Sequence, residues 1–215
     1  MITKLLLAVI QGVPITLVVT GGAFALGFVF AIPVTAMRRS KSLILRTIAR
    51  MYIDIVRGIP PIVWLFIIFF GVGTQVIELG SMQAAIVGMG VVSSAYIAEI
   101  YRGGLLALAR GQVEAATALG MTPWDKFRHV VAPQVLRVSI PPLATYFVSL
   151  LKDTTVASTI GVNDILMLAS QEAQSGGGGF APFVVAAVLY VLLSAPVGIF
   201  SRRMDERLRL AEVAK

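Results

Sequence analysis

The chain has 215 residues, of which 57% are hydrophobic and only 13% are charged. So few charged residues cannot cover a water-soluble globule, so the composition excludes an ordinary soluble domain and favours a membrane protein. The net charge of +7 would suit nucleic acid, but the basic residues form short clusters beside apolar runs, without interleaved aromatic residues. Membrane topology explains these clusters, and we expect no nucleic-acid partner. Because the chain has no cysteine, a disulfide framework and a cysteine-based metal site are also excluded.

The first apolar run covers residues 5–37 and contains no charged residue. A helix needs about 20 apolar residues to cross a bilayer. We therefore expect the first span at 16–37, after an interfacial lead-in at 2–13. Three glycines in this span would let a neighbouring helix approach closely: Gly21, Gly22 and Gly27.

The second element combines a basic helix with an apolar run. Residues 42–56 have a helical pattern but are too charged to lie in lipid, whereas residues 59–73 carry no charge. Between them, Arg57-Gly58-Ile59-Pro60-Pro61 lacks two backbone donors and permits a bend. We expect a broken span at 52–73. Arg57, Gly58, Pro60 and Pro61 then form either a pore-lining hinge or the simple start of a helix at Pro60.

Three further spans are expected at 82–108, 134–151 and 180–201. Residues 154–160 are apolar enough to enter the membrane again, and a flexible tetraglycine at 176–179 precedes the last span. Lys and Arg gather after the first span, between the third and fourth, and after the fifth. By the positive-inside rule the N-terminus lies outside and the C-terminus lies in the cytoplasm. The predicted fold is an all-α polytopic membrane protein, with five transmembrane helices in a single domain.

Residues 111–133 form a polar segment between two spans, which we call the elbow. Residues 113–119 favour a short helix, and Gly120 stands where a left-handed residue would end it. Thr122 opens a second helix with Asp125 three residues later, as in a variant of the capping box. Pro133 would end or kink that helix.

The second helix of the elbow has one apolar face. Trp124, Phe127 and Val131 share this face, and charged residues occupy the rest. The elbow is therefore predicted to be a protruding helix–glycine–helix segment whose apolar anchor fits a groove on a partner.

Several segments together resemble one family. Glu114-Ala115-Ala116, followed by Gly120 and Pro133, is similar to the EAA loop of ABC-importer permeases. The longer stretch from Gly111 to Thr122, together with residues 57–61, 95–104 and 151–155, resembles the polar amino acid uptake branch, with its histidine, glutamine and arginine permeases. The resemblance covers nearly the whole chain from Val13. It departs at Ala132, where the family usually has leucine.

The resemblance implies a type I permease subunit of an ATP-driven amino acid importer in the bacterial plasma membrane. The expected partners are a second permease copy or paralogue, two cytoplasmic ATPase subunits, an extracytoplasmic solute-binding protein and the amino acid itself. ATP and Mg would be bound by the ATPase, so this chain would carry no cofactor. The loop would dock into the ATPase through its coupling residues, which are Glu114, Ala115, Ala116, Leu119, Gly120, Met121, Trp124, Phe127 and Pro133.

Polar residues in the spans have two interpretations. Glu99 and Arg102 are three residues apart and would form a local ion pair, with Arg57 as another possible partner. Ser93 and Ser94 would bond backbone carbonyls or join helices. The other interpretation is a polar translocation path that suits the ammonium and carboxylate of an amino acid, formed by Ser93, Ser94, Tyr96, Glu99, Lys152, Asp153, Thr154 and Thr155. For Lys152 and Asp153, a salt bridge that locks helices is the alternative.

The sequence lacks the residues of an ATPase or a membrane hydrolase. It contains no G-x-x-x-x-G-K-[ST] motif. Its single histidine, His129, has no second His or Cys with which to bind a metal or form a nucleophilic dyad. Two other functions stay open, namely an ion-coupled transporter or channel using Glu99 or Asp153, and a membrane scaffold whose elbow recruits a protein. Neither the amino acid nor the identity of the second permease follows from the sequence.

Overall fold

The computed structural model describes residues 2–73, 78–175 and 179–213, and every regular element in these ranges is helical. The predicted all-helical class is therefore confirmed. The elements are α1 (Ile2–Ile10), α2 (Val13–Arg38), α3 (Leu43–Gly58), α4 (Pro61–Phe66), the π-helix η1 (Ile67–Val72), α6 (Ser81–Leu106), α7 (Arg110–Ala118), α8 (Pro123–Lys126), the π-helix η2 (Phe127–Val131), α9 (Ala132–Asp153), the 3₁₀-helix η3 (Thr154–Ile160), α10 (Ile165–Gln174) and α11 (Ala181–Val213).

The described residues contain four helical stretches long and apolar enough to cross a membrane. They are Thr3–Arg38, Ser81–Leu106, Pro123–Ile160 and Ala181–Glu206. The pair Leu43–Gly58 and Pro61–Val72 passes the same test together, although it bends by 103°. Counting this bent pair as one gives the five spans that were predicted.

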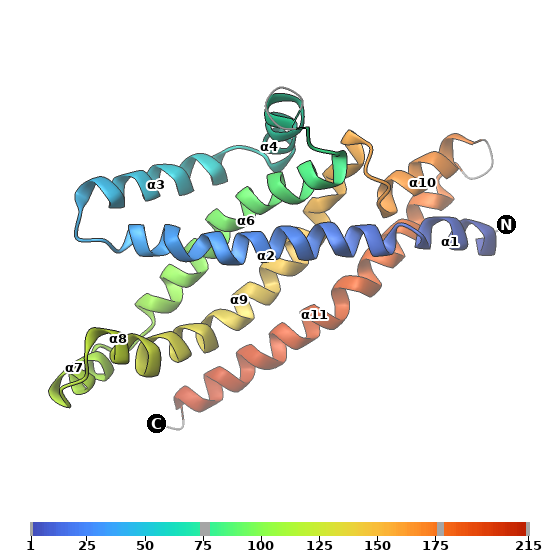
Figure 1. The fold of residues 1–215 in the computed structure, drawn as a ribbon. Helices are drawn as coiled ribbons and strands as arrows, with labels where there is room; N and C mark the ends of the chain where they lie inside the picture. The colour runs from blue at the N-terminus through green and yellow to red at the C-terminus, as the bar shows by residue number, and fades with distance from the viewer. Residues whose placement is uncertain (1, 74–77, 176–178, 214–215) are drawn as a thin grey trace.

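The packing centres on α2 and α6, which lie side by side through the middle of the molecule (Figure 1). A Cβ on Gly27 would overlap the Cβ of Ser93, and a Cβ on Gly22 would lie 3.1 Å from the Ile86 side chain. These two glycines therefore allow the predicted close approach. Gly21 does not contribute, because nothing lies within 4 Å of the position of its Cβ.

The elbow and the N-terminal segment lie at opposite ends of the molecule (Figure 1). α9 packs against both α6 and α11 on its way from the elbow. At the other end, α1 packs on α10 and α11, where Val9, Ile165 and Ala169 are fully buried. Thr154, Ala157 and Ile160 are buried where η3 contacts α4 and α6, and the entry of residues 154–160 into the membrane stays a prediction.

The second span breaks where the sequence predicted. Ile59 and Pro60 are extended, and α4 begins at Pro61, whose missing N–H costs nothing in a first helical turn. The indole N–H of Trp64 donates to the carbonyl of Val56 at 3.1 Å, which satisfies a carbonyl at the end of α3 across the bend.

Other boundaries differ from the prediction. Pro133 does not end the second elbow helix, because it lies in the first turn of α9, which continues directly from η2. The fourth helical stretch therefore begins at Pro123 instead of 134. α11 also continues to Val213, beyond the expected end at 201. Most of the tetraglycine lies outside the described residues.

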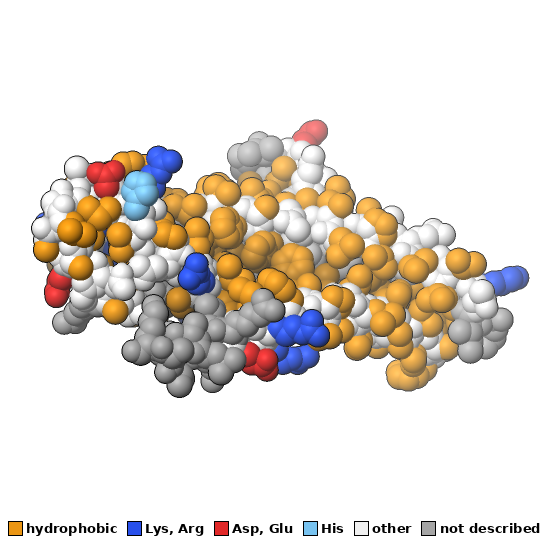
Figure 2. Space-filling model, turned by 90° about the horizontal axis from the view of Figure 1, so that it is seen from below, with side chains coloured by type: hydrophobic (Ala, Val, Ile, Leu, Met, Phe, Trp, Pro, Cys, Tyr) orange, Lys and Arg blue, Asp and Glu red, His pale blue; other side chains and the backbone are white. Residues whose placement is uncertain are grey.

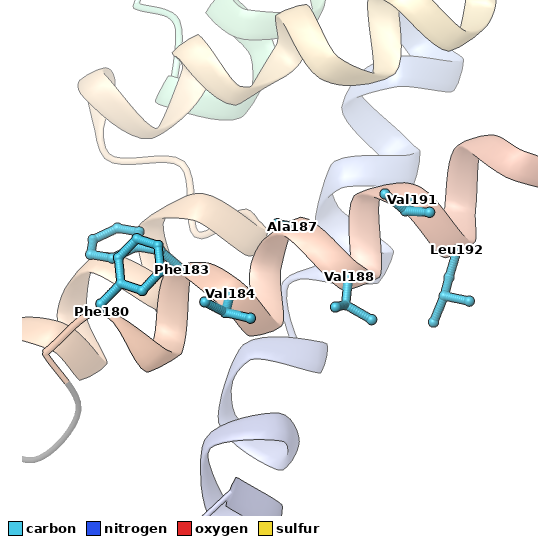
Figure 3. A pocket seen from close by; sticks show the side chains of 7 residues that line it. All are labelled: Phe180, Phe183, Val184, Ala187, Val188, Val191 and Leu192. Carbon is cyan, nitrogen blue, oxygen red and sulfur yellow. The ribbon is translucent and has the colours of Figure 1, made fainter.

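Apolar side chains cover much of the middle of the face in Figure 2, and charged side chains gather toward the elbow end. One face of α11 is almost purely apolar between Phe180 and Leu192. It carries an open groove of about 530 Å³, lined from Phe180 to Leu192 by aromatic and aliphatic side chains (Figure 3). Such a helix face suits the hydrocarbon of a bilayer.

Candidate functional site

The corner of the elbow is a complete C-terminal helix cap. Gly120 has a φ of +73°, as predicted for a left-handed residue. Its N–H donates to the carbonyl of Thr117 at 3.0 Å, and the N–H of Met121 donates to the carbonyl of Ala116 at 3.2 Å. This pair of bonds is the Schellman motif, which satisfies carbonyls that the end of α7 would leave free.

The second elbow helix starts with the predicted cap. The Thr122 hydroxyl accepts from the Asp125 N–H at 3.2 Å and donates to the Asp125 carboxylate at 2.5 Å. Unlike in a standard capping box, the acidic side chain binds the hydroxyl of the cap. The Lys126 ammonium then donates to the Thr117 hydroxyl at 2.8 Å, which joins the two elbow helices. The elbow is therefore stabilised by the cap at Gly120 and by the Lys126–Thr117 bond between its two helices.

Large apolar side chains remain exposed on this well-bonded segment. Leu119 is 81% exposed, Trp124 is 64% exposed and Phe127 is 49% exposed. The rings of Trp124 and Phe127 lie 5.9 Å apart. Exposed apolar groups of this kind are typical of surfaces that contact a protein or a membrane.

The other predicted coupling residues have different surroundings. Glu114, Ala115 and Pro133 are exposed, and Met121 is half-buried. Ala116 is only 3% exposed, so it packs inside the elbow. His129 is exposed, and its Nδ1 lies 3.0 Å from the carbonyl oxygen of Asp125. In the described part of the chain no three His, Cys, Asp or Glu residues cluster as metal ligands.

Within the spans, the two buried serines connect helices. The Tyr146 hydroxyl donates to the Ser93 hydroxyl at 3.0 Å, linking α9 to α6. The hydroxyls of Ser94 and Tyr52 lie 2.5 Å apart, linking α6 to α3, and Ser94 also donates to the carbonyl of Val91. Both bonding modes considered for the serines are present.

Arginine, aromatic and acidic groups continue this polar region along α6. The Arg57 guanidinium lies 5.0 Å from the centre of the Tyr96 ring, and Tyr96 stacks on Tyr146 at 5.2 Å. Arg102 and Glu99 form a two-pronged ion pair, with distances of 2.8 to 3.0 Å. The predicted local ion pair is present, and Arg57 contacts an aromatic ring.

The residues at the end of α9 separate into two environments. Lys152 and Asp153 are exposed, whereas Thr154 is buried. The hydroxyl of Thr154 lies 3.1 Å from that of Thr20 on α2 and donates to the carbonyl of Leu151. Thr155 is half-buried. The predicted path residues thus belong to two groups in the chain, one on α6 and one at the end of α9, and whether they line a common path stays a prediction.

Sequence reasoning missed three members of this bonded region, namely Tyr52, Tyr146 and Thr20. Thr20 and Tyr146 are hydroxyl-bearing residues in apolar stretches, and Tyr52 lies on the more charged helix α3. A buried hydroxyl needs a partner, and that requirement is the signal that could have singled them out.

The fold and the elbow together define a class, namely an α-helical membrane protein with a helix–glycine–helix elbow between two of its spans. The family described as "Binding-protein-dependent transport system inner membrane component" matches residues 23–210. The chain belongs to this family. The predicted resemblance to ABC-importer permeases is thereby confirmed, and the chain is a permease subunit rather than an enzyme.

Individual relatives agree with this assignment. The probable amino-acid ABC transporter permease protein YckA of Bacillus subtilis (strain 168) is 32% identical over 203 residues, or 93% of this chain and 88% of that protein. The nopaline transport system permease protein NocQ of Agrobacterium fabrum (strain C58 / ATCC 33970) is 32% identical over 198 residues, or 86% and 84% of the two chains. The crystal structure of an amino acid ABC transporter with histidines has a TM-score of 0.85, is 29% identical, and covers 95% and 94% of the two chains.

Proposed function

We propose that this chain is the permease of a polar amino acid importer and that its elbow receives the force of a cytoplasmic ATPase. The observation that carries the proposal is the exposure of Leu119, Trp124 and Phe127 on a fully capped elbow. A surface that stays apolar although its backbone is rigid is suited to a preformed groove on a partner. The amino acid class is supported by the names of the relatives.

The continuity of η2 with α9 supports a mechanical role for the elbow. The helix that carries Phe127 continues without a break into α9, whose far end holds Lys152. Movement of the elbow against an ATPase would therefore displace a transmembrane helix directly. ATP and Mg belong to the ATPase, and closure of two such subunits would drive the spans between inward-open and outward-open arrangements.

The proposed path follows the polar face of α6. Arg57 and the Tyr96 ring offer a cation and a π face to a zwitterionic substrate, and Lys152 and Asp153 offer both charges at the end of α9. Since five spans do not easily enclose a channel, we propose that a second copy or a paralogous permease completes it. In this scheme the elbow and the C-terminus face the cytoplasm, and a solute-binding protein delivers the substrate at the opposite side.

The docking proposal is tested with charge and backbone variants of the elbow. Gly120→Val places a side chain at positive φ, which costs roughly 1–2 kcal/mol. Nothing lies within 4 Å of the position of a Cβ there, so the cost of the substitution comes from backbone strain and not from a clash with a neighbour. Glu114 is exposed, so Glu114→Lys reverses a surface charge without disturbing the fold. Both variants should reach the membrane normally, lose co-purifying ATPase and lose ATP-driven uptake into proteoliposomes.

Matched controls separate docking from folding. Gly111→Ala changes an exposed glycine that has no positive φ and no neighbour within 4 Å, so it should leave uptake unchanged. Glu114→Gln should have a smaller effect than Glu114→Lys. Full ATP-driven uptake by both Gly120→Val and Glu114→Lys would refute the proposal, because a coupling element is required for coupling.

The proposed path makes a separate prediction. Glu99→Gln and Lys152→Met remove charges while preserving approximate size. Each should lower amino acid uptake about tenfold or more while ATPase co-purification stays normal. Ser149→Ala, at an exposed position of α9 whose hydroxyl bonds only its own helix, is the control. Normal uptake by both charge variants would place Glu99 and Lys152 outside the path.

A further inference from the structure

A second cavity lies beside the elbow and shares only Phe127 with the docking surface proposed above. It has a volume of about 570 Å³ and is formed by the last part of α2, the end of α6, and the segment from Phe127 to Leu136. This volume lies within the range of small-molecule sites. We call it the elbow cavity. Its lining is aliphatic and aromatic except at Thr35, Arg39 and Tyr101.

The three polar residues have different bonding states. Thr35 is satisfied, because its hydroxyl donates to the carbonyl of Ala31 at 2.7 Å and lies 3.3 Å from that of Ala98. Tyr101 is only 7% exposed, and its hydroxyl oxygen has no hydrogen-bond partner among the described residues. A buried hydroxyl without a partner is unfavourable. Tyr101 therefore has an unused donor and acceptor that is buried beside an otherwise apolar cavity.

The depth of the cavity matches one leaflet of a bilayer. Phe28 lines its inner end, where the Tyr101 ring contacts it edge-on at 5.6 Å. Arg39 lines it just beyond the end of α2 and is exposed. At the rise of an α-helix, Phe28 and Arg39 are about 16 Å apart along the axis. This is half of the hydrocarbon thickness, which is about 30 Å.

The charges at the Arg39 end define the class of ligand. Arg38 and Lys41 flank Arg39 in the sequence, and no acidic residue lines the cavity. The Nε of Arg38 is also buried without a hydrogen-bond partner in the described part of the chain. Basic pockets between transmembrane helices at the headgroup level attract anionic lipids. The cavity thus has a cationic mouth, a buried hydroxyl and an apolar interior.

We propose that the elbow cavity binds one anionic phospholipid, with its phosphate at Arg39, an ester oxygen at the Tyr101 hydroxyl, and an acyl chain reaching toward Phe28. A lipid in this position contacts α2 and also Phe127 and Val131 of the elbow helix. It therefore stabilises the packing of the elbow helix against α2. This inference does not depend on the docking of an ATPase. Lipid affinity is measured without nucleotide, so its result does not change if the elbow fails to couple to ATP hydrolysis.

The test uses the purified transporter complex, with lipid binding followed by native mass spectrometry. Dioleoyl phosphatidylglycerol is titrated against dioleoyl phosphatidylcholine, which has the same chains without net negative charge. We expect tighter binding of phosphatidylglycerol. Arg39→Gln should lower its affinity about fivefold, because one basic residue near a surface contributes about that factor. Lys41→Gln, two residues away and outside the cavity lining, should change it less.

A second pair of variants tests the apolar part. Ala36 lines the cavity, so Ala36→Phe should fill it and displace phosphatidylglycerol. Val29→Phe adds bulk on the same helix at an exposed position outside the lining and should leave binding intact. Tyr101→Phe should weaken lipid binding yet leave the lipid-free complex as heat-stable as the wild type or more so, because an unpaired buried hydroxyl is removed.

Equal affinity for the two lipids, or retention of phosphatidylglycerol by both Arg39→Gln and Ala36→Phe, would overturn the proposal. If Ala36→Phe leaves lipid binding intact but prevents the pairing of two permeases, the cavity is a subunit interface and the proposal is also overturned.

Discussion

At the scale of single residues, Asp164 combines two conflicting roles. One carboxylate oxygen accepts from the Met167 N–H at 2.8 Å and caps α10. The other carboxylate oxygen is buried without a hydrogen-bond partner among the described residues, and the side chain as a whole is 2% exposed. Burial raises the pKa of Asp164 to about 6 from the usual 3.8, although bonds from backbone N–H groups lower it in part. Ionisation of the buried Asp164 carboxylate therefore destabilises the fold, whereas its hydrogen bond at the start of α10 stabilises it.

This conflict predicts a pH dependence of stability. Below about pH 3 the carboxyl is protonated in both the folded and the unfolded state, so its burial carries no charge penalty. As the pH rises from about 3 to 6 the unfolded state ionises first, and stability falls by roughly 3 kcal/mol. Asp164→Asn keeps an oxygen for the cap and removes the charge. The variant should melt at a higher temperature than the wild type at pH 7, and the difference should disappear at about pH 3. A difference that stays constant with pH would show that Asp164 is not the titrating group.

Which residues could be predicted depended on how local their interactions are. Gly120 and the cap of Thr122 bond neighbours within five residues, so composition and spacing identified both. The Glu99–Arg102 pair was also predictable from helical spacing. The bonds of Tyr146 to Ser93 and of Tyr52 to Ser94 join residues more than 40 positions apart. They depend on how helices are packed, which no local pattern determines.

At the scale of elements, helices are longer than the charge-free runs that predict them. A charge-free run marks where a helix can cross a membrane, but the helix itself can continue further, as α11 does up to Val213. Of the two outcomes expected at Pro133, an end of the helix is excluded, because the π-helix η2 continues directly into α9. The i→i+5 pattern changes which carbonyl the proline would face, so the helix passes through.

The α2–α6 contact gives a prediction about packing. Gly27→Ala would place a Cβ against both the side chain and the backbone of Ser93, and this site cannot yield by moving a flexible side chain. Overpacking of this kind costs about 1–3 kcal/mol. The melting temperature of the purified permease should fall accordingly. Gly21→Ala, on the same helix but facing open space, should be neutral or slightly stabilising, because alanine favours a helix.

The opposite result would mean that Gly21, and not Gly27, faces the more closely packed surface. If Gly21→Ala is the more destabilising change, Gly21 faces a surface that a single chain does not contain, such as a second permease. A loss of pairing between permeases in that variant would locate the subunit contact on the outer side of α2.

At the scale of the whole molecule, the elbow and α10 lie at opposite ends of the spans (Figure 1). From the basic residues near the elbow and the positive-inside rule we propose that the elbow lies in the cytoplasm, so that α10 would face outward. The docking of an ATPase at Trp124 and the delivery of substrate near α10 both require this orientation. Orientation is therefore the property on which the proposed mechanism depends most.

The chain is well suited to a test of orientation because it contains no native cysteine. Gln174 is exposed at the end of α10, and Gln174→Cys should react with an impermeant maleimide in intact cells. In the elbow, Arg128 is a better site than Lys126, because Lys126 bonds Thr117 and joins the two elbow helices. Arg128→Cys should react only after the membrane is permeabilised. Labelling of Arg128→Cys but not of Gln174→Cys in intact cells would invert the topology. The exposed aromatic side chains of the elbow would then face away from any cytoplasmic ATPase, and the coupling mechanism would fail with the orientation.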